Sequence, residues 1–194
     1  MLGRQAKTLT GSQAKAVLLH LGTTRNPVRN RLIFLLSIKA GLRAKEIAEL
    51  TWRMVTDAQG QLTKQMRLEN TAAKGMSGGV IAMNRELAEA LGAWRKLCWG
   101  TDGPSRVIRT ERSKATSAPV IVNLFQDWYR AMGFEGCSSH SGRRTFITNA
   151  ARKISLVGGS LRDIQALARH SSLSMTQRYI EADVDAQKRV VELI

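Results

Sequence analysis

The stretch Ile164-Gln-Ala-Leu-Ala-Arg-His170-Ser-Ser-Leu-Ser-Met-Thr-Gln-Arg-Tyr179 places a tyrosine nine residues after a histidine. Taken alone, this tyrosine is as typical of an amphipathic core residue as of a reactive group. The histidine alone is equally typical of a helix C-terminus, where the helix dipole favours it. A phenol has an ordinary pKa near 10 and needs help to attack a phosphodiester at neutral pH. The meaning of Tyr179 therefore depends on residues elsewhere in the chain.

Two clusters upstream carry side chains suited to holding a phosphate. In His140-Ser-Gly-Arg143 the histidine and arginine are three residues apart, so on a helix they share a face. The planar fork of an arginine matches two phosphate oxygens. In Arg43-Ala-Lys-Glu46 the glutamate lies one turn after the arginine and can orient it through an ion pair. Each pattern alone is more often an ordinary solvated helix face or helix start.

Apolar residues at helical spacing predict that most of the chain is helical. Asn26-Pro27 is a helix start signal, Gly41 a stop signal, and Ser160-Leu-Arg-Asp163 a capping box. The predicted helices cover residues 10–21, 27–41, 44–50, 84–98 and 118–132, a segment capped by Ser138 or Ser139 that carries His140 and Arg143, a segment from Ser160 that carries His170, and residues 176–180.

The region from Trp52 to Met83 is the exception, because its residues alternate between apolar and polar. We expect a short first strand near Met54-Val55, followed by a hairpin with Lys74 at its glycine-rich tip. A lysine there can deliver an ammonium proton to a leaving oxygen, although exposed turn lysines are common. The predicted fold class is mainly α with a small three-stranded antiparallel sheet.

Charge is the outlying feature of the composition. Thirty Lys and Arg against fifteen Asp and Glu give a net charge of +15 in 194 residues, with 43% hydrophobic residues. This excess favours a polyanionic partner, most simply nucleic acid, over a charge that only maintains solubility. No apolar run is long enough for a membrane span, and two isolated cysteines fit a reducing compartment. We therefore expect a cytoplasmic, nucleoid-associated protein with no membrane partner.

We expect one domain over residues 1–194, because no repeat or proline-rich linker divides the chain. A basic leader covers residues 1–9, a catalytic core residues 10–180, and a C-terminal tail residues 181–194. The tail is rich in acidic residues, so it is not expected to follow phosphates. It can pack on its own chain or dock on another subunit.

Together these residues resemble the catalytic domain of the tyrosine recombinases, the phage-integrase family. The resemblance rests on Gly41-Leu-Arg43-x-x-Glu46, the hairpin lysine Lys74, His140-x-x-Arg143, and His170 followed by Tyr179, and runs from about Thr10 to Asp183. It implies the DNA breaking-rejoining fold of that family, a double-stranded DNA substrate and a homotetramer on paired sites.

The resemblance also implies the roles of six catalytic residues. Tyr179 attacks the scissile phosphate and leaves a 3′-phosphotyrosine, Arg43 and Arg143 hold the phosphate oxygens, and His170 donates to the same phosphate. His140 assists proton removal from the tyrosine, Lys74 protonates the departing 5′ oxygen, and Glu46 supports Arg43. The phosphotyrosine stores the energy of the broken bond, so we expect no cofactor and no metal.

The sequence departs from the family pattern in three places. Ala168-Arg169-His170 stands where the family usually has Leu-Gly-His, and the hairpin has Gly79 and Ala82 where an arginine and a proline are common. The usual N-terminal DNA-binding domains are not expected, as in short stand-alone DNA invertases of the family.

Three other functions remain open from the sequence. The segment Ala44-Lys-Glu-Ile-Ala-Glu-Leu resembles the first helix of a helix-turn-helix, which would fit a non-catalytic DNA-binding regulator. A type IB topoisomerase uses similar chemistry without pairing two sites. A recombinase fragment that cleaves poorly without a clamp domain is the third alternative.

Overall fold

The computed structural model describes residues 5–73, 78–98, 100–111, 113–179 and 191–192. Helices dominate this part of the chain, as the apolar spacing predicted. The elements are α1 (Gly11–Gly22), α2 (Pro27–Ala40), α3 (Ala44–Glu49), η1 (Trp52–Met54), β1 (Gln65–Leu68), β2 (Gly79–Ala82), α4 (Arg85–Lys96), α5 (Ala118–Ala131), α6 (Ser141–Lys153), η3 (Ile154–Val157), α7 (Leu161–Ala168) and α8 (Leu173–Gln177).

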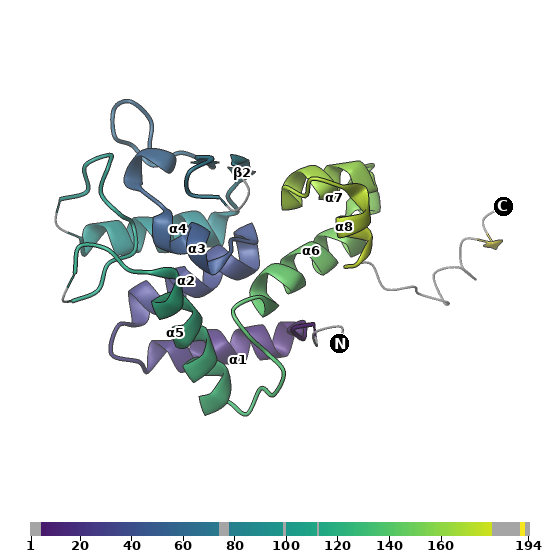
Figure 1. Ribbon diagram of the computed structural model, residues 1–194, viewed down its shortest axis with the longest axis horizontal. Helices are drawn as coiled ribbons and strands as arrows, with labels where there is room; N and C mark the ends of the chain where they lie inside the picture. Colours follow the sequence, from purple (N-terminus) through teal and green to yellow (C-terminus); the bar gives the residue numbers. More distant parts are fainter. Residues whose placement is uncertain (1–4, 74–77, 99, 112, 180–190, 193–194) are drawn as a thin grey trace.

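Helix α2 forms the centre of the molecule (Figure 1). Residues 32–36 are fully buried, and α2 packs against α1, α4 and α6. A helix that is apolar on all sides is stable only when other elements surround it. The predicted start and stop signals of this helix are confirmed. Asn26 is the N-cap, Pro27 is the first helical residue, and Gly41 is a left-handed C-cap with φ 64°.

Side-chain caps start several of the other helices. Thr10 and Gln13 form a capping box at α1, and the Asn84 side chain accepts from the backbone N–H of Leu87 at α4. The predicted box of Ser160 and Asp163 begins α7. These short-range bonds satisfy backbone donors that lack a partner in the first helical turn.

In the described residues the sheet has two strands, not the three that the sequence predicted. The prediction of a strand at Met54-Val55 is wrong. Strands β1 and β2 pair antiparallel, with Met66 opposite Ile81. Trp52, Met54 and Val55 are all buried, whereas a strand sends adjacent side chains to opposite faces. The segment instead forms the turn η1, in which the N–H of Val55 donates to the carbonyl of Trp52 over 3.0 Å.

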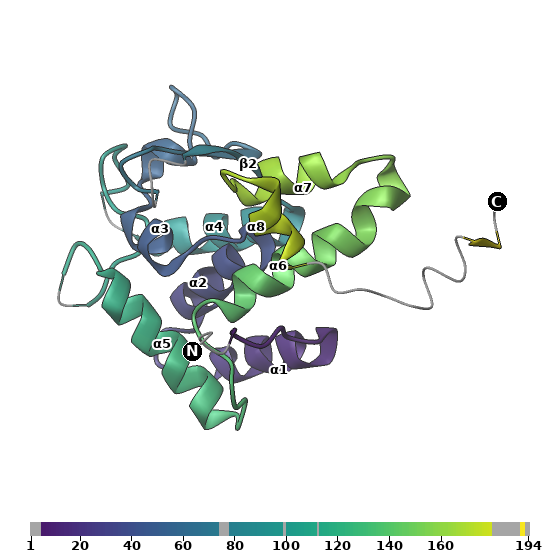
Figure 2. The same cartoon turned by 45° about the vertical axis from the view of Figure 1, so that its right-hand side comes forward.

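Helices α6, α7 and α8 and the turn η3 form a C-terminal lobe beside the main body (Figures 1 and 2). Ile147, Ile164 and Ala168 make a small core of their own, and Tyr179 packs against it. We call this group, residues 141–179, the C-terminal lobe. Helix α6 joins it to the main body through its contact with α2.

The lobe corrects three expected helix positions. Helix α6 begins at Ser141, and its N-cap is His140. The prediction that Ser138 or Ser139 caps this helix is therefore wrong. Helix α7 ends at Ala168, because Arg169 adopts a left-handed conformation, and His170 follows the helix. Helix α8 covers Leu173–Gln177, a few residues before the expected position.

Two predicted features lie outside the described residues. These are Lys74 at the hairpin tip and the tail 181–194, of which only Val191 and Glu192 are described. Within the described ranges, none of the helices combines the length and apolar character that a bilayer crossing requires.

Gly142 allows α6 to approach α2 closely. A Cβ on Gly142 would lie 2.3 Å from Oγ of Ser37 and 3.2 Å from its backbone carbon. We expect Gly142→Ala to lower the free energy of unfolding by about 1–3 kcal/mol, because overpacking forces one helix away from the other. Urea unfolding followed by circular dichroism measures this change. Gly22→Ala is the matched control, since a Cβ there meets nothing within 4 Å. Equal stability of the two variants would contradict the close approach.

Candidate active site

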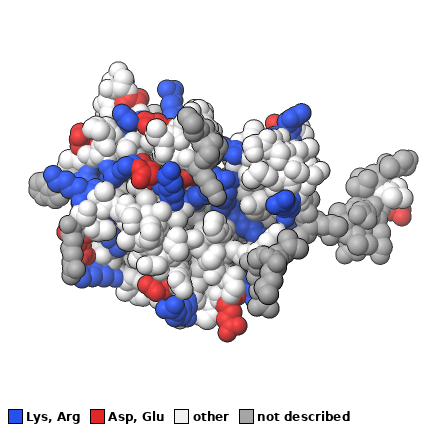
Figure 3. All heavy atoms as spheres, viewed as in Figure 1, with Lys and Arg blue, Asp and Glu red and all other residues white. Residues whose placement is uncertain are grey.

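A basic hollow separates the C-terminal lobe from the main body. Its volume is about 1390 Å³, and Figure 3 shows lysine and arginine side chains gathered where the two parts meet. Among the described residues that line it, Glu135 carries the only acidic side chain. The basic lining residues are Lys7, Arg43, Arg143, Arg144, Arg169 and Arg178. Such a surface attracts a polyanion.

Arg43 reaches this hollow from the start of α3, where it is the N-cap. Its Nη1 donates to Oε1 of Glu46 over 2.7 Å, and its backbone N–H donates to Oε2 over 2.9 Å. The Glu46 side chain is fully buried, while that of Arg43 is 18% exposed. The ion pair expected from the sequence is therefore present, and it directs the partly exposed guanidinium.

Arg143 lies in the first turn of α6 and is buried. Its Nη1 donates to the carbonyl of Gly41 over 2.6 Å, and its Nη2 donates to the carbonyl of Ala168 over 2.5 Å. One guanidinium thus connects the end of α2, the start of α6 and the end of α7. These two bonds fix its orientation at the wall of the hollow.

His170 and Tyr179 form a pair in the C-terminal lobe. Their rings stack with centroids 5.4 Å apart and planes 25° apart. Nδ1 of His170 lies 3.0 Å from Oγ1 of the buried Thr176. The carbonyl of Tyr179 accepts from Oγ1 of Thr148 over 3.2 Å. Both rings are thereby held at the end of the C-terminal lobe.

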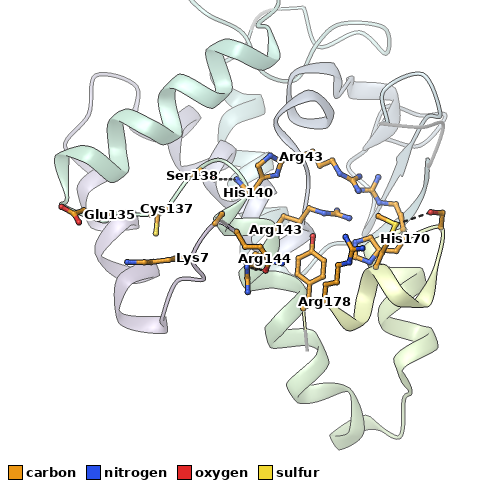
Figure 4. A pocket seen from close by; sticks show the side chains of 17 residues that line it. Lys7, Arg43, Glu135, Cys137, Ser138, His140, Arg143, Arg144, His170 and Arg178 are labelled. Carbon is orange, nitrogen blue, oxygen red and sulfur yellow. Dashed lines mark hydrogen bonds between the residues drawn. The ribbon is translucent and has the colours of Figure 1, made fainter. Parts of the chain in front are cut away.

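His140 lies at the rim of the same hollow and is exposed. Its backbone N–H donates to Oγ of Ser138 over 3.3 Å. Figure 4 shows Arg43, His140, Arg143 and His170 side by side, with Lys7, Glu135 and Cys137 farther along the hollow. Five of the six predicted catalytic residues therefore line one cavity, and Lys74 lies outside the described residues.

Burial and mutual charge shift the pKa values of the ionisable groups here. Burial raises the pKa of Glu46, but hydrogen bonds and charge from Arg169 and then Arg43 outweigh it, so the pKa is lowered overall. Burial, followed by the charge of Arg43, lowers the pKa of Arg143 to about 10, so it stays protonated at neutral pH. Burial and the charges of Arg143, Arg43 and Arg169 lower the pKa of His170 to about 4. Neutral His170 therefore faces charged arginines.

Comparison of the sequence with models of known protein families shows which family the chain belongs to. The model of the phage integrase family matches residues 7–185. The chain belongs to this family. The match covers the main body and the C-terminal lobe, including every candidate residue named above.

Curated relatives are tyrosine recombinases. The chain is 30% identical to the tyrosine recombinase XerC of Rhizobium meliloti over 157 residues, which are 80% of this chain and 46% of the relative. It is 28% identical to the tyrosine recombinase XerA of Thermococcus kodakarensis over 189 residues, 96% of this chain and 62% of the relative. The chain thus spans about half to two thirds of the length of these relatives.

Solved structures share the fold. The crystal structure of XerA recombinase superposes with a TM-score of 0.72 at 21% identity, covering 100% of this chain and 65% of that one. The Tn1549 transposon integrase in complex with a circular intermediate DNA gives 0.75 at 20% identity, covering 96% and 65%. The mainly α fold with a small antiparallel sheet is therefore that of a tyrosine-recombinase catalytic domain. The comparisons give no support to the regulator or topoisomerase alternatives.

The structure brings to the candidate site residues that the motifs did not supply. Thr176 contacts His170 from six residues away. Lys7, near the N-terminus, and Arg144, on α6, both line the hollow. Only the basic character of these last two gave a signal. No group of three or more metal-ligating His, Cys, Asp or Glu residues occurs in the described ranges.

The lowered pKa of His170 predicts how stability depends on pH. A folded-state pKa near 4 against an ordinary value of 6.5 means that the unfolded chain binds the proton more tightly. The resulting stabilisation is fully present above pH 6.5 and is lost as the pH falls toward 4. An NMR titration of the three histidines measures the pKa directly, and thermal unfolding between pH 7 and 4 measures the linkage. A His170 pKa at or above 6.5 would contradict the burial among arginines.

Proposed function

We propose that this integrase is a site-specific DNA recombinase that cuts and rejoins strands through Tyr179. The observation that carries the proposal is that Arg43, Arg143, His140, His170 and Tyr179 line one basic hollow. Each supplies something a phenol lacks when it attacks a phosphodiester: charge neutralisation, a hydrogen bond, or a site for its proton. The names of the curated relatives, tyrosine recombinases XerC and XerA, support the same activity.

In the proposed cleavage, the phenolic oxygen of Tyr179 attacks the scissile phosphorus. A new bond forms between phosphorus and the tyrosine oxygen, and the bond to the 5′ oxygen breaks, which leaves a 3′-phosphotyrosine. Arg43 and Arg143 hold the two non-bridging oxygens, where negative charge grows in the transition state. Reversal with another DNA 5′-hydroxyl rejoins the strands, so the reaction consumes no cofactor.

Two proton transfers accompany this exchange. His140, exposed at the rim, accepts the phenolic proton directly or through water. Lys74 protonates the departing 5′ oxygen. His170 is neutral in the free protein and donates from Nε2 when Thr176 donates to its Nδ1. A bound phosphate would raise the pKa of His170, because a nearby negative charge favours the imidazolium.

The proposed partner is double-stranded DNA, which fits the net charge of +15. Complexes of the Tn1549 transposon integrase with circular intermediate DNA and of XerH with its difH substrate support DNA as the ligand. We also propose that residues 1–194 form one domain with its catalytic core at residues 10–180, that four copies assemble on paired sites, and that the protein works in the cytoplasm on nucleoid DNA.

The test uses nicked duplexes with a randomised target region, because no target sequence is assumed. Attack near a nick releases a short oligonucleotide, so the covalent complex cannot reverse. The protein is denatured in detergent, and DNA that remains attached is sequenced. We expect enrichment of one sequence class in wild-type complexes. A folded wild-type protein that retains no DNA above a Tyr179→Phe background would overturn the proposal.

Assays on DNA that carries the selected site also distinguish a recombinase from a topoisomerase and from a DNA-binding regulator. A recombinase joins two marked duplexes that carry the selected site, whereas a topoisomerase relaxes supercoiled plasmid without a paired site. A regulator binds DNA and forms no adduct.

A further inference from the structure

Arg169 has an unusual backbone conformation. Among the described residues it is the only non-glycine with a positive φ, at φ 54° and ψ 47°. This left-handed conformation costs a side-chain-bearing residue roughly 1–2 kcal/mol relative to a right-handed one. Glycine would relieve the strain, so other contacts of Arg169 must hold it in place.

The side chain of Arg169 makes a buried ion pair with α3. Its Nη2 donates to Oε2 of Glu46 over 2.8 Å, with the two side chains only 5% and 0% exposed. The other carboxylate oxygen of Glu46 accepts from Nη1 of Arg43. One buried carboxylate therefore binds two guanidinium groups, one from the main body and one from the C-terminal lobe.

Arg169 also passes beside the hairpin. A Cβ on Gly79, the first residue of β2, would lie 3.6 Å from Cδ and 3.8 Å from Cγ of Arg169. Helix α7 and strand β2 are neighbours in both ribbon views (Figures 1 and 2). Two positions at which the sequence departs from the family pattern are thus neighbours in space. The small residue at 79 leaves room for the arginine stem.

The turn that contains Arg169 carries the reactive pair. The carbonyl of Ala168, one residue before, accepts from Arg143, and His170, one residue after, stacks on Tyr179. Two buried arginines therefore hold this turn, one through α6 and one through Glu46. Moving the turn would move His170 and Tyr179 relative to the guanidinium of Arg43.

We propose that Arg169 is a positioning residue for DNA cleavage. It fixes the His170–Tyr179 pair relative to Arg43 through the shared carboxylate of Glu46. The proposal rests on the recombinase function argued above, and it assigns Arg169 no contact with DNA.

Arg169→Gly removes this link while keeping the left-handed turn, because glycine adopts that backbone without strain. We expect the single-turnover rate of adduct formation on a selected nicked duplex to fall about 10- to 100-fold, since small displacements of reacting groups have effects of this size. DNA affinity should change less than about threefold, because the guanidinium is buried and its charge is paired with Glu46. Arg169→Lys keeps the charge and should recover part of the rate.

A double-mutant cycle tests the route through Glu46. The double variant Glu46→Gln/Arg169→Gly should form adduct no more slowly than Glu46→Gln alone. Both substitutions break the same ion pair, so their effects on the rate should not add. Arg85→Ala is the matched control, since Arg85 forms an exposed pair with Glu89 on α4. A wild-type rate for Arg169→Gly would overturn the proposal. So would a rate loss equal to a loss of DNA affinity, or one that is additive with Glu46→Gln.

A measurement on the free protein keeps the proposal testable if wild-type protein forms no adduct. In side-chain NMR, the Nε–H of Arg43 should give a resolved signal in wild type and in Arg85→Ala. That signal should broaden or disappear in Arg169→Gly, because Glu46 loses its second partner. An unchanged signal overturns the positioning role, whereas missing adduct with the expected NMR change overturns only the recombinase function.

Discussion

Tyr179→Phe should form no covalent DNA complex, with at least about a 1000-fold loss of adduct, while DNA binding persists. The substitution removes one oxygen, and that oxygen is the atom proposed to bond to phosphorus. The arginines that line the hollow cannot replace it, because a guanidinium has no lone pair to donate at neutral pH. Nucleophile removal commonly costs factors of this order or more.

The measurement combines detergent-resistant adduct with gel-shift affinity on the same nicked duplex. Phenylalanine preserves the stacking on His170 and the packing against Ile147 and Ile164, so the lobe should remain folded. Tyr129→Phe is the matched control, because Tyr129 lies in the main core and outside the hollow. Mass spectrometry of wild-type adduct should place the nucleotide on Tyr179. Adduct formation by Tyr179→Phe, or a nucleotide on another residue, would assign the nucleophile elsewhere.

Local sequence signals predicted most of the helices because the bonds that decide them are local. Asn26-Pro27, Gly41 and the pair of Ser160 and Asp163 act within one turn of the chain, and each lies where it was expected. The prediction of a strand at Met54-Val55 was wrong because contacts distant in the sequence decide the structure there. Three neighbouring apolar residues are buried by tertiary packing there, and the packing overrides the alternating pattern.

The motifs predicted which residues gather, but not the links that hold them. Spacing within Arg43-x-x-Glu46 anticipated an ion pair over one helical turn. Nothing local signalled that Arg169 would bind the same carboxylate from 123 residues away, or that Arg143 would bind carbonyls at Gly41 and Ala168. Such links depend on how α6 and α7 pack on the main body, which a sequence pattern of one element does not encode.

Arg143 should be the most sensitive of the arginines. Arg143→Ala leaves the carbonyls of Gly41 and Ala168 without this donor, and a buried unsatisfied acceptor costs about 1–3 kcal/mol. We expect a lower thermal midpoint together with loss of adduct. Because that result mixes folding with chemistry, Arg143→Lys is the more informative change.

Arg143→Lys keeps the charge but removes the planar fork. A single ammonium cannot bind two carbonyls on different segments and also present a donor to a phosphate oxygen in a fixed direction. We expect a fall of about 100- to 1000-fold in the single-turnover rate of adduct formation, the usual cost of losing one transition-state donor. Arg85→Lys on α4 should cleave at the wild-type rate. A rate for Arg143→Lys within about threefold of wild type would mean that charge alone suffices, and that the two carbonyl bonds only stabilise the fold. If the rate falls while the thermal midpoint is kept, the fork that joins α2, α6 and α7 is also what orients the phosphate for Tyr179.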